Sequence, residues 1–149
     1  TKTPKIPGTD GRKMSKSYGN AINIADDPEE IWEKLRTMVT DTARERRSDP
    51  GNPDKCPVWD LHKAFNQDME QRAFIDKGCR TAGIGCIECK QALYSHLMAI
   101  LEPIQSRRRA FEANEEDLLE VLKKGAMKAE KVSEVTIEEV IKAIGFISR

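Results

Sequence analysis

Apolar residues recur at helical spacing through most of this 149-residue chain, and no segment shows the alternation of a half-buried strand. The clearest stripe carries Leu93, Leu97, Ile100, Leu101, Ile104 and Phe111. Side chains three and four residues apart lie on the same face of an α-helix, where they can be buried together. We therefore predict an all-α fold in which this segment forms a long helix.

Helix-start and helix-stop residues divide the first half of the chain. Residues 26–30 read Asp-Asp-Pro-Glu-Glu, which suits a helix start because acids stabilise its positive end and proline fits its first turn. This helix is expected to end near Asp41. Helical spacing resumes over residues 58–65, and a short helix is predicted over residues 69–76, with Gly78 as its stop signal.

The second half of the chain carries further boundary signals. Pro103 is expected to kink the long helix, because proline lacks the amide hydrogen that the helix uses. Asn114 is a typical cap for another helix. Thr136, with Glu139 three residues later, predicts the start of a last helix, and Gly145 predicts its end.

Charge and hydropathy narrow the class of protein. Lysine plus arginine and aspartate plus glutamate number 25 each, so any nucleic-acid contact must come from local basic patches rather than net charge. Charged residues make up 34% and hydrophobic residues 38%, as in a soluble helical protein with a modest core. No apolar run approaches the roughly 18 residues that span a bilayer, and no signal-peptide pattern opens the chain. We expect a cytoplasmic protein with no membrane contact.

The pentapeptide Lys13-Met14-Ser15-Lys16-Ser17 lies in a glycine-flanked, irregular N-terminal arm. Two ammonium groups three residues apart can converge on a polyphosphate, while serine hydroxyls and loop amides add hydrogen-bond donors. Such a loop would stabilise the charge that develops on departing pyrophosphate. A lysine pair at this spacing is also common on solvated surfaces, so the pair alone leaves both interpretations open.

The full pentapeptide matches the signature loop of class I aminoacyl-tRNA synthetases. The surrounding KIPGTDGRKMSKSYGNAI resembles the version in tryptophanyl-tRNA synthetases, and so does PGNPDKCPVWDLHKAF at residues 50–65, which argues against the tyrosyl relatives. The resemblance covers essentially the whole chain. It implies that Lys13 and Lys16 are catalytic and bind the phosphates of ATP, which carries magnesium. The other ATP-binding residues that it implies are Met14, Ser15 and Ser17.

The same resemblance implies an overall organisation. Residues 1–25 would belong to the catalytic domain, and residues 26–149 would form the helical anticodon-binding domain. The intact enzyme would activate tryptophan with ATP, transfer it to its tRNA and act as a homodimer. That family also needs a nucleotide-binding half with a His-Ile-Gly-His signature. Neither His62 nor His96 fits this signature, so both are interpreted as structural, and we expect a C-terminal part that is inactive alone.

Four cysteines follow the spacing C-x22-C-x6-C-x2-C, at positions Cys56, Cys79, Cys86 and Cys89. Disulfides are disfavoured in the cytoplasm, and three of the four cysteines lie in a glycine-rich segment rather than on an apolar stripe. Metal binding is therefore the preferred interpretation. Structural zinc usually uses two cysteine pairs, whereas a [4Fe–4S] cluster takes four thiolates, one of them often followed by proline as in Cys56-Pro57. The spacing alone does not separate the two.

Family resemblance ranks these alternatives. A subset of bacterial tryptophanyl-tRNA synthetases is similar in having four cysteines here that bind a [4Fe–4S] cluster beside the anticodon-binding part. This ranks the [4Fe–4S] cluster first, zinc second and free thiols third, with residues 56–89 as the cluster segment. Its expected role is structural, because metal binding would contribute folding energy directly.

Candidate tRNA contacts are basic side chains, because RNA readers stack bases on arginine planes and hydrogen-bond their edges. Lys77 and Arg80 lie near the cysteines in sequence and are the assigned candidates. Two further groups are candidates whose alternative explanation is solvated surface, and for the second group that explanation is at least as good. They are Arg44, Arg46 and Arg47, and Arg107, Arg108 and Arg109.

One rival function comes from another class of protein. The chain could be a free-standing helical module with a metal centre that binds RNA or senses redox state. That hypothesis leaves the Lys-Met-Ser-Lys-Ser loop without a role.

Overall fold

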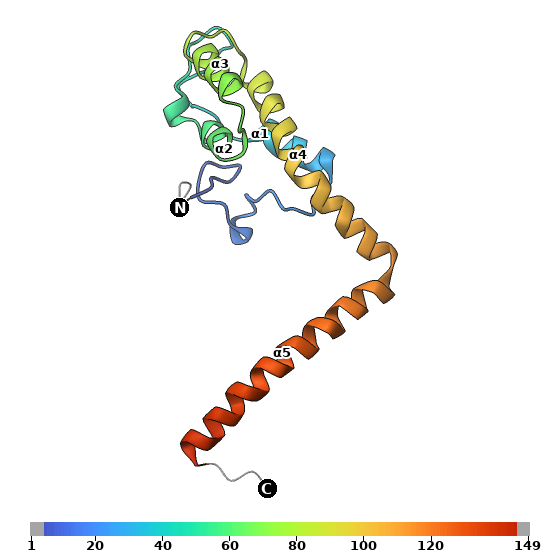
Figure 1. Ribbon diagram of the computed structural model, residues 1–149. Coiled ribbons are helices and arrows are strands. Elements are labelled where there is room, and N and C mark those ends of the chain that lie inside the picture. Colours follow the sequence, from blue (N-terminus) through green and yellow to red (C-terminus); the bar gives the residue numbers. More distant parts are fainter. Residues whose placement is uncertain (1–4, 146–149) are drawn as a thin grey trace. The chain divides into compact units, whose positions relative to one another are not determined.

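The computed structural model describes residues 5–145, and its regular elements there are all helical (Figure 1). The predicted all-α fold is confirmed, since no strand forms within these residues and one isolated bridge pairs Pro7 with Lys13. The elements are η1 (Lys16–Tyr18), α1 (Pro28–Thr37), η2 (Pro53–Lys55), α2 (Pro57–Phe65), α3 (Met69–Arg80), α4 (Cys86–Ala113) and α5 (Glu115–Ile144).

The chain forms two compact units, Thr1–Gln105 and Ser106–Arg149, so the boundary between them falls within α4. The first unit contains the N-terminal arm, helices α1 to α3 and most of α4 (Figure 1). The predicted division at residue 25 rests on membership of a catalytic domain rather than on contacts within this chain. It stays a prediction.

The core of the first unit is built by apolar side chains from α1, α2 and α4. Its buried members are Ile31, Leu35, Met38, Val58, Leu61, Leu93, Leu97 and Leu101. Trp32 of α1 and Tyr94 of α4 add an edge-to-face pair at the border, with ring centroids 5.6 Å apart. The leucines of the predicted stripe therefore face the core, whereas its other members are 42–45% exposed, so that part of the prediction is wrong. These are Ile100, Ile104 and Phe111.

A buried lysine ends α1 earlier than expected. The helix begins after Asp27, as predicted, but ends at Thr37 rather than near Asp41. Lys90 of α4 is only 4% exposed, and its Nζ donates hydrogen bonds to the carbonyls of Arg36 (2.8 Å) and Met38 (2.6 Å). Because these carbonyls at the end of α1 are paired with Lys90, the chain can turn away there.

Gly78 does not end α3, and that prediction is wrong. The helix continues to Arg80, and Thr81 then closes it by donating its backbone amide to Lys77. A Cβ on Gly78 would lie 3.0 Å from Cγ2 of Ile84. The glycine lets the buried Ile84 pack against the helix, which a local stop signal does not reveal.

A single helix, α5, replaces the two helices that were predicted after Asn114. Asn114 caps it as expected, since its Oδ1 accepts the amide of Asp117, and Gly145 ends it in the left-handed conformation with φ 68°. Thr136 does not start a new helix, because its Oγ1 donates to the carbonyl of Val132 within α5. Helix α4 remains helical through Pro103, and the kink that was expected there stays a prediction.

In the second unit, Ile141 is partly buried and the other residues of 106–145 are exposed. The apolar side chains of α5 therefore have no core within the described part of this unit. None of the helices between residues 5 and 145 combines the length and apolar character needed to cross a bilayer.

Substituting Leu93→Ala should lower the free energy of unfolding of the first unit by about 2–5 kcal/mol, because Leu93 is fully buried and the change leaves a cavity. Both tryptophans lie in this unit, so urea unfolding followed by tryptophan fluorescence measures its stability. Ile100→Ala on the same helix is the control, because Ile100 is 45% exposed and should change stability by about 0.5 kcal/mol or less. Equal losses in both variants would contradict the assigned core.

Candidate phosphate-binding loop and cysteine site

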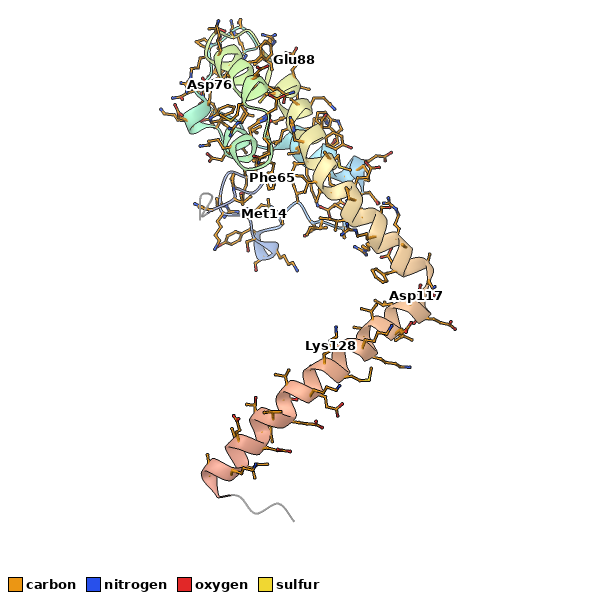
Figure 2. The ribbon with its side chains drawn as sticks, in the orientation of Figure 1. Met14, Phe65, Asp76, Glu88, Asp117 and Lys128 are labelled. Atoms are coloured by element: carbon orange, nitrogen blue, oxygen red, sulfur yellow. The ribbon has the colours of Figure 1, made fainter. Side chains whose placement is uncertain are left out.

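The arm that carries residues 13–17 is irregular, yet it is closed by backbone hydrogen bonds. Met14 donates its amide to the carbonyl of Ile6 (2.9 Å), and Gly8 donates to Arg12 (2.7 Å). The 3₁₀ turn η1 then carries Lys16, and Gly19 ends it with φ 64°. Figure 2 labels Met14 on this arm. The loop is thus a closed structure rather than an extended tail.

Lys13 and Lys16 point their charges outward. Both are exposed, and neither forms an ion pair with any residue in the part of the chain that the structure describes. A cavity of about 460 Å³ is lined by Met14, Ser15, Lys16 and residues 21–25. The loop therefore offers two available ammonium groups, one of them at the wall of a cavity.

Asn20 lies at the centre of the loop, although the sequence alone did not identify it. It is 2% exposed, and its Oδ1 accepts the backbone amide of Ser15 (2.8 Å). Its Nδ2 donates to Asp10 Oδ1 (2.7 Å) and to the carbonyl of Lys13 (3.3 Å). A buried asparagine in a loop can be found only after folding, because its partners lie up to ten residues away.

The four cysteines lie at helix ends that the first unit brings together. Cys56 precedes α2, Cys79 is in the last turn of α3, and Cys86 and Cys89 are in the first turn of α4. All four are partly buried and none forms a disulfide. Burial, followed by the charges of the other three thiols, raises the pKa of Cys89 to about 12. The four sulfur atoms therefore share one neighbourhood.

The loop between α1 and α2 approaches this neighbourhood. Arg44 Nη1 lies 3.8 Å from Cys86 Sγ, and its Nη2 donates to the carbonyls of Arg47 (2.9 Å) and Ile84 (2.8 Å). A Cβ on Gly51 would lie 2.7 Å from Cys79 Sγ, so only glycine allows this approach. A cavity of about 310 Å³ is lined by residues 44–47 and 85–88 (Glu88 is labelled in Figure 2).

A single metal ion and a four-iron cluster require different arrangements of the four thiols. Within residues 5–145, no three histidine, cysteine, aspartate or glutamate side chains are grouped so that they could hold a metal ion. A zinc ion about 2.3 Å from each sulfur would draw the four sulfurs to within roughly 4 Å of one another. A four-iron cluster is larger than an ion and spaces its thiolates more widely. Four thiols in one neighbourhood are a donor set that suits either a four-iron cluster or zinc.

His62 contacts Cys89, although the two residues lie 27 positions apart in the sequence. Its Nε2 lies 3.1 Å from the carbonyl and 3.4 Å from Sγ of Cys89. Asn66 Nδ2 lies 3.4 Å from its Nδ1 and donates to Gln71 Oε1, which is 2.7 Å from His96 Nε2. Full burial lowers the pKa of His62 to about 4, so the ring is neutral at pH 7. Both histidines belong to a polar network between helices.

The candidate tRNA contacts are placed differently. Arg80 pairs with Asp76 one turn earlier and with Asp54 (2.9 Å), and these carboxylates raise its pKa (Asp76 is labelled in Figure 2). Lys77 is exposed and forms no ion pair within residues 5–145. The structure thus leaves Lys77 available, whereas Arg80 is engaged in linking α3 to η2.

The two arginine groups are also distinct from one another. Arg44 and Arg47 donate to backbone carbonyls around residues 82–84, so they hold the loop over the cysteines. Arg108 pairs with Glu112 on the same helix (2.7 Å), and Arg107 and Arg109 are exposed.

Comparison with known proteins places this chain among synthetases. The family model described as tRNA synthetases class I (W and Y) matches residues 1–102. The tryptophan–tRNA ligase of Aquifex aeolicus is 48% identical and matches 97% of this chain and 36% of its own length. That of Thermotoga maritima is 44% identical, with coverages of 99% and 45%. The chain therefore spans less than half the length of these relatives.

Solved structures agree with the sequence comparison. The tryptophanyl-tRNA synthetase of Campylobacter jejuni, complexed with ADP and tryptophan, has a TM-score of 0.83 and 26% identity. The match covers 95% of this chain and 44% of the Campylobacter jejuni chain. The enzyme of Aeropyrum pernix matches 68% of this chain with a TM-score of 0.61 and 36% identity.

The neutral His62 should make folding sensitive to acid. Below pH 6.5 the unfolded chain protonates this histidine, while the folded chain excludes the proton until about pH 4, so stability falls across this window. The loss should reach up to about 1.4 kcal/mol per pH unit. Urea unfolding of the reduced, metal-free chain, followed by the fluorescence of Trp59 beside His62, measures it. His62→Gln should flatten this slope and the control His96→Gln should keep it; equal slopes in wild type and His62→Gln would contradict the assignment.

Proposed function

This chain belongs to the class I tRNA synthetases of the tryptophan and tyrosine group, and from this premise we propose that it is the C-terminal part of a tryptophan–tRNA ligase. The relatives that bear this name support tryptophan as the amino acid. The observation that carries the proposal is the closed Lys-Met-Ser-Lys-Ser loop, with both lysines exposed and Lys16 at the wall of a cavity.

Lys13 and Lys16 would bind the phosphates of ATP in the whole enzyme. The carboxylate of tryptophan attacks the α-phosphorus, pyrophosphate leaves with the bonding electrons, and the lysines stabilise its growing negative charge. Backbone amides and the hydroxyls of Ser15 and Ser17 would add donors, and Met14 would shape the loop. A hydroxyl of the tRNA then displaces AMP from the activated tryptophan. These 149 residues supply the loop but no His-Ile-Gly-His signature.

Cys56, Cys79, Cys86 and Cys89 would hold a [4Fe–4S] cluster, with zinc as the second choice. The shared neighbourhood of the four thiols supports a metal site, and the family resemblance places the cluster before zinc. Arg44 and Lys90 place positive charge beside the sulfurs, which would offset the negative charge of four thiolates. The bound group would tie α2, α3 and α4 together and would contribute folding energy.

The helical part would bind the anticodon of the tRNA, with Lys77 as the available basic contact on α3. Arg80 would act mainly through its ion pairs with Asp54 and Asp76. The family resemblance further implies a cytoplasmic homodimer. A free-standing metal-binding RNA module stays the alternative, and it predicts that the loop lysines have no effect on tryptophan activation.

Joining this chain to the N-terminal portion of the Aquifex aeolicus enzyme, in place of the region that it matches, should yield tryptophan-dependent exchange of pyrophosphate into ATP. Lys13→Ala or Lys16→Ala should lower the kcat of exchange by about 100-fold or more, because each removes a charge that stabilises the leaving pyrophosphate. Lys5→Ala is the control, since Lys5 is exposed in the same arm but outside the loop. Full exchange by the lysine variants, or exchange by this chain alone, would contradict the proposal.

Anaerobic purification of the chain should yield about four iron and four sulfide per molecule, with the broad brown absorbance of a cubane cluster. Cys86→Ser or Cys89→Ser should lower both contents, because each removes a thiolate. Ala92→Ser on the same helix, which removes no thiol, is the control. One zinc per molecule without sulfide would show a zinc site in place of the cluster. The absence of both iron and zinc would contradict the interpretation of the cysteines as metal ligands.

A further inference from the structure

We propose that Asn20 is a positioning residue that sets the separation of Lys13 and Lys16 in the phosphate-binding loop. This inference rests on the function proposed above. Asn20 contacts no lysine side chain in the described residues; it acts on the backbone from which both lysines project.

The side-chain amide of Asn20 pairs with two consecutive peptide groups. Its Oδ1 accepts the Ser15 amide (2.8 Å) and its Nδ2 donates to the Lys13 carbonyl (3.3 Å). These two groups flank Met14, so one amide fixes the backbone on both sides of it, as a neighbouring strand would. Lys16 follows directly after Ser15 and begins η1, so the same contact fixes where the turn starts.

Asp10 holds the amide in this orientation. Its Oδ1 accepts hydrogen bonds from Asn20 Nδ2 (2.7 Å) and from the Arg12 backbone amide (2.9 Å). Its Oδ2 accepts one from Arg12 Nε (2.7 Å). The Asn20 bond and then those from Arg12 lower the pKa of Asp10 to about 2, so it is a carboxylate at neutral pH. An acceptor at this point allows only the nitrogen of Asn20 to face it.

Gly8 closes the remaining side. A Cβ on Gly8 would overlap the Asn20 side-chain amide and would lie 2.6 Å from the backbone carbonyl oxygen of Asn20. The amide is therefore confined between Gly8, Asp10 and the backbone at Met14. A side chain with 2% exposure and this many partners has little freedom to move.

Asn20 also joins the loop to the helical body. Thr9 donates its amide to the Asn20 carbonyl (3.0 Å), and the Thr9 carbonyl accepts the amide of Val39, just after α1 (2.9 Å). Asn20 therefore links the backbone that carries both lysines, through Thr9, to the end of α1. Misplacing a catalytic group by about 1 Å can lower a rate by roughly 100-fold.

Asn20→Asp is the most informative variant, because it keeps the shape and replaces a donor by an acceptor facing Asp10 and the Lys13 carbonyl. In the joined enzyme described above, kcat for pyrophosphate exchange should fall at least 10-fold, while KM for tryptophan stays within twofold. The iron content should not change. Asn114→Asp makes the same chemical change at a helix cap where both residues serve equally, and should leave kcat within twofold.

Two combinations separate positioning from general damage. In the Lys13→Ala, Lys16→Ala background, Asn20→Asp should lower kcat by less than twofold further, because the groups that it positions are gone. Exchanging the pair, as Asp10→Asn with Asn20→Asp, restores a donor facing an acceptor and should recover part of the lost kcat. An unchanged kcat in Asn20→Asp, or effects that multiply with those of the lysine variants, would overturn the proposal.

A measurement on this chain alone keeps the inference separate from the proposed function. Hydrogen exchange by NMR should show a protected Ser15 amide in wild type and rapid exchange in Asn20→Asp. Unchanged Ser15 protection would overturn the positioning role whether or not the joined enzyme is active. An inactive wild-type joined enzyme, with Ser15 protection lost in the variant, would count against the synthetase function while supporting the loop geometry.

Discussion

The packing of Leu93, Leu97 and Leu101 of α4 against α1 and α2 holds the first unit together, and both candidate sites depend on it. Burying a leucine stabilises a fold by about 1.5–3 kcal/mol. No single helix of this unit can bury its own apolar face. Packing the three helices together brings the N-terminal ends of α2 and α4 near the C-terminal end of α3. The four cysteines lie at those ends.

The first turns of α4 contribute side chains to the cysteine site, to the core and to the end of α1. Cys89 faces the other thiols and His62, Leu93 enters the core, and Lys90 between them reaches the end of α1. Burial lowers the pKa of Lys90, and its hydrogen bonds to two carbonyls make this buried position tolerable for a cation. The segment that receives these bonds is followed by Val39, which donates to Thr9 of the arm. The cysteine site and the phosphate-binding loop therefore share one scaffold.

The two sites use charge in opposite ways. The loop keeps Lys13 and Lys16 exposed to water, and under the proposed function they would lose this solvation only when a phosphate replaced it. The cysteine site places Arg44 beside partly buried sulfurs and holds it with backbone carbonyls, so its charge is fixed in advance. An exposed pair suits a substrate that arrives and leaves, whereas fixed cations suit a resident anionic group.

The sequence by itself determined the helical class, the starts of α1, α2 and α5, the signature loop and the cysteine set. These depend on neighbours within a few residues, where spacing and capping chemistry act directly. Only the tertiary structure decided that α3 continues past Gly78, because the reason is Ile84 packed against it. The same holds for Asn20, His62 and Lys90, whose partners lie between 4 and 54 residues away in sequence. The contacts of His62 with Cys89 and of Lys90 with the end of α1 span 27 to 54 residues, so they form only when core burial has brought those segments together. The partners of Asn20 lie 5 to 10 residues away, and they meet only along the folded path of the loop.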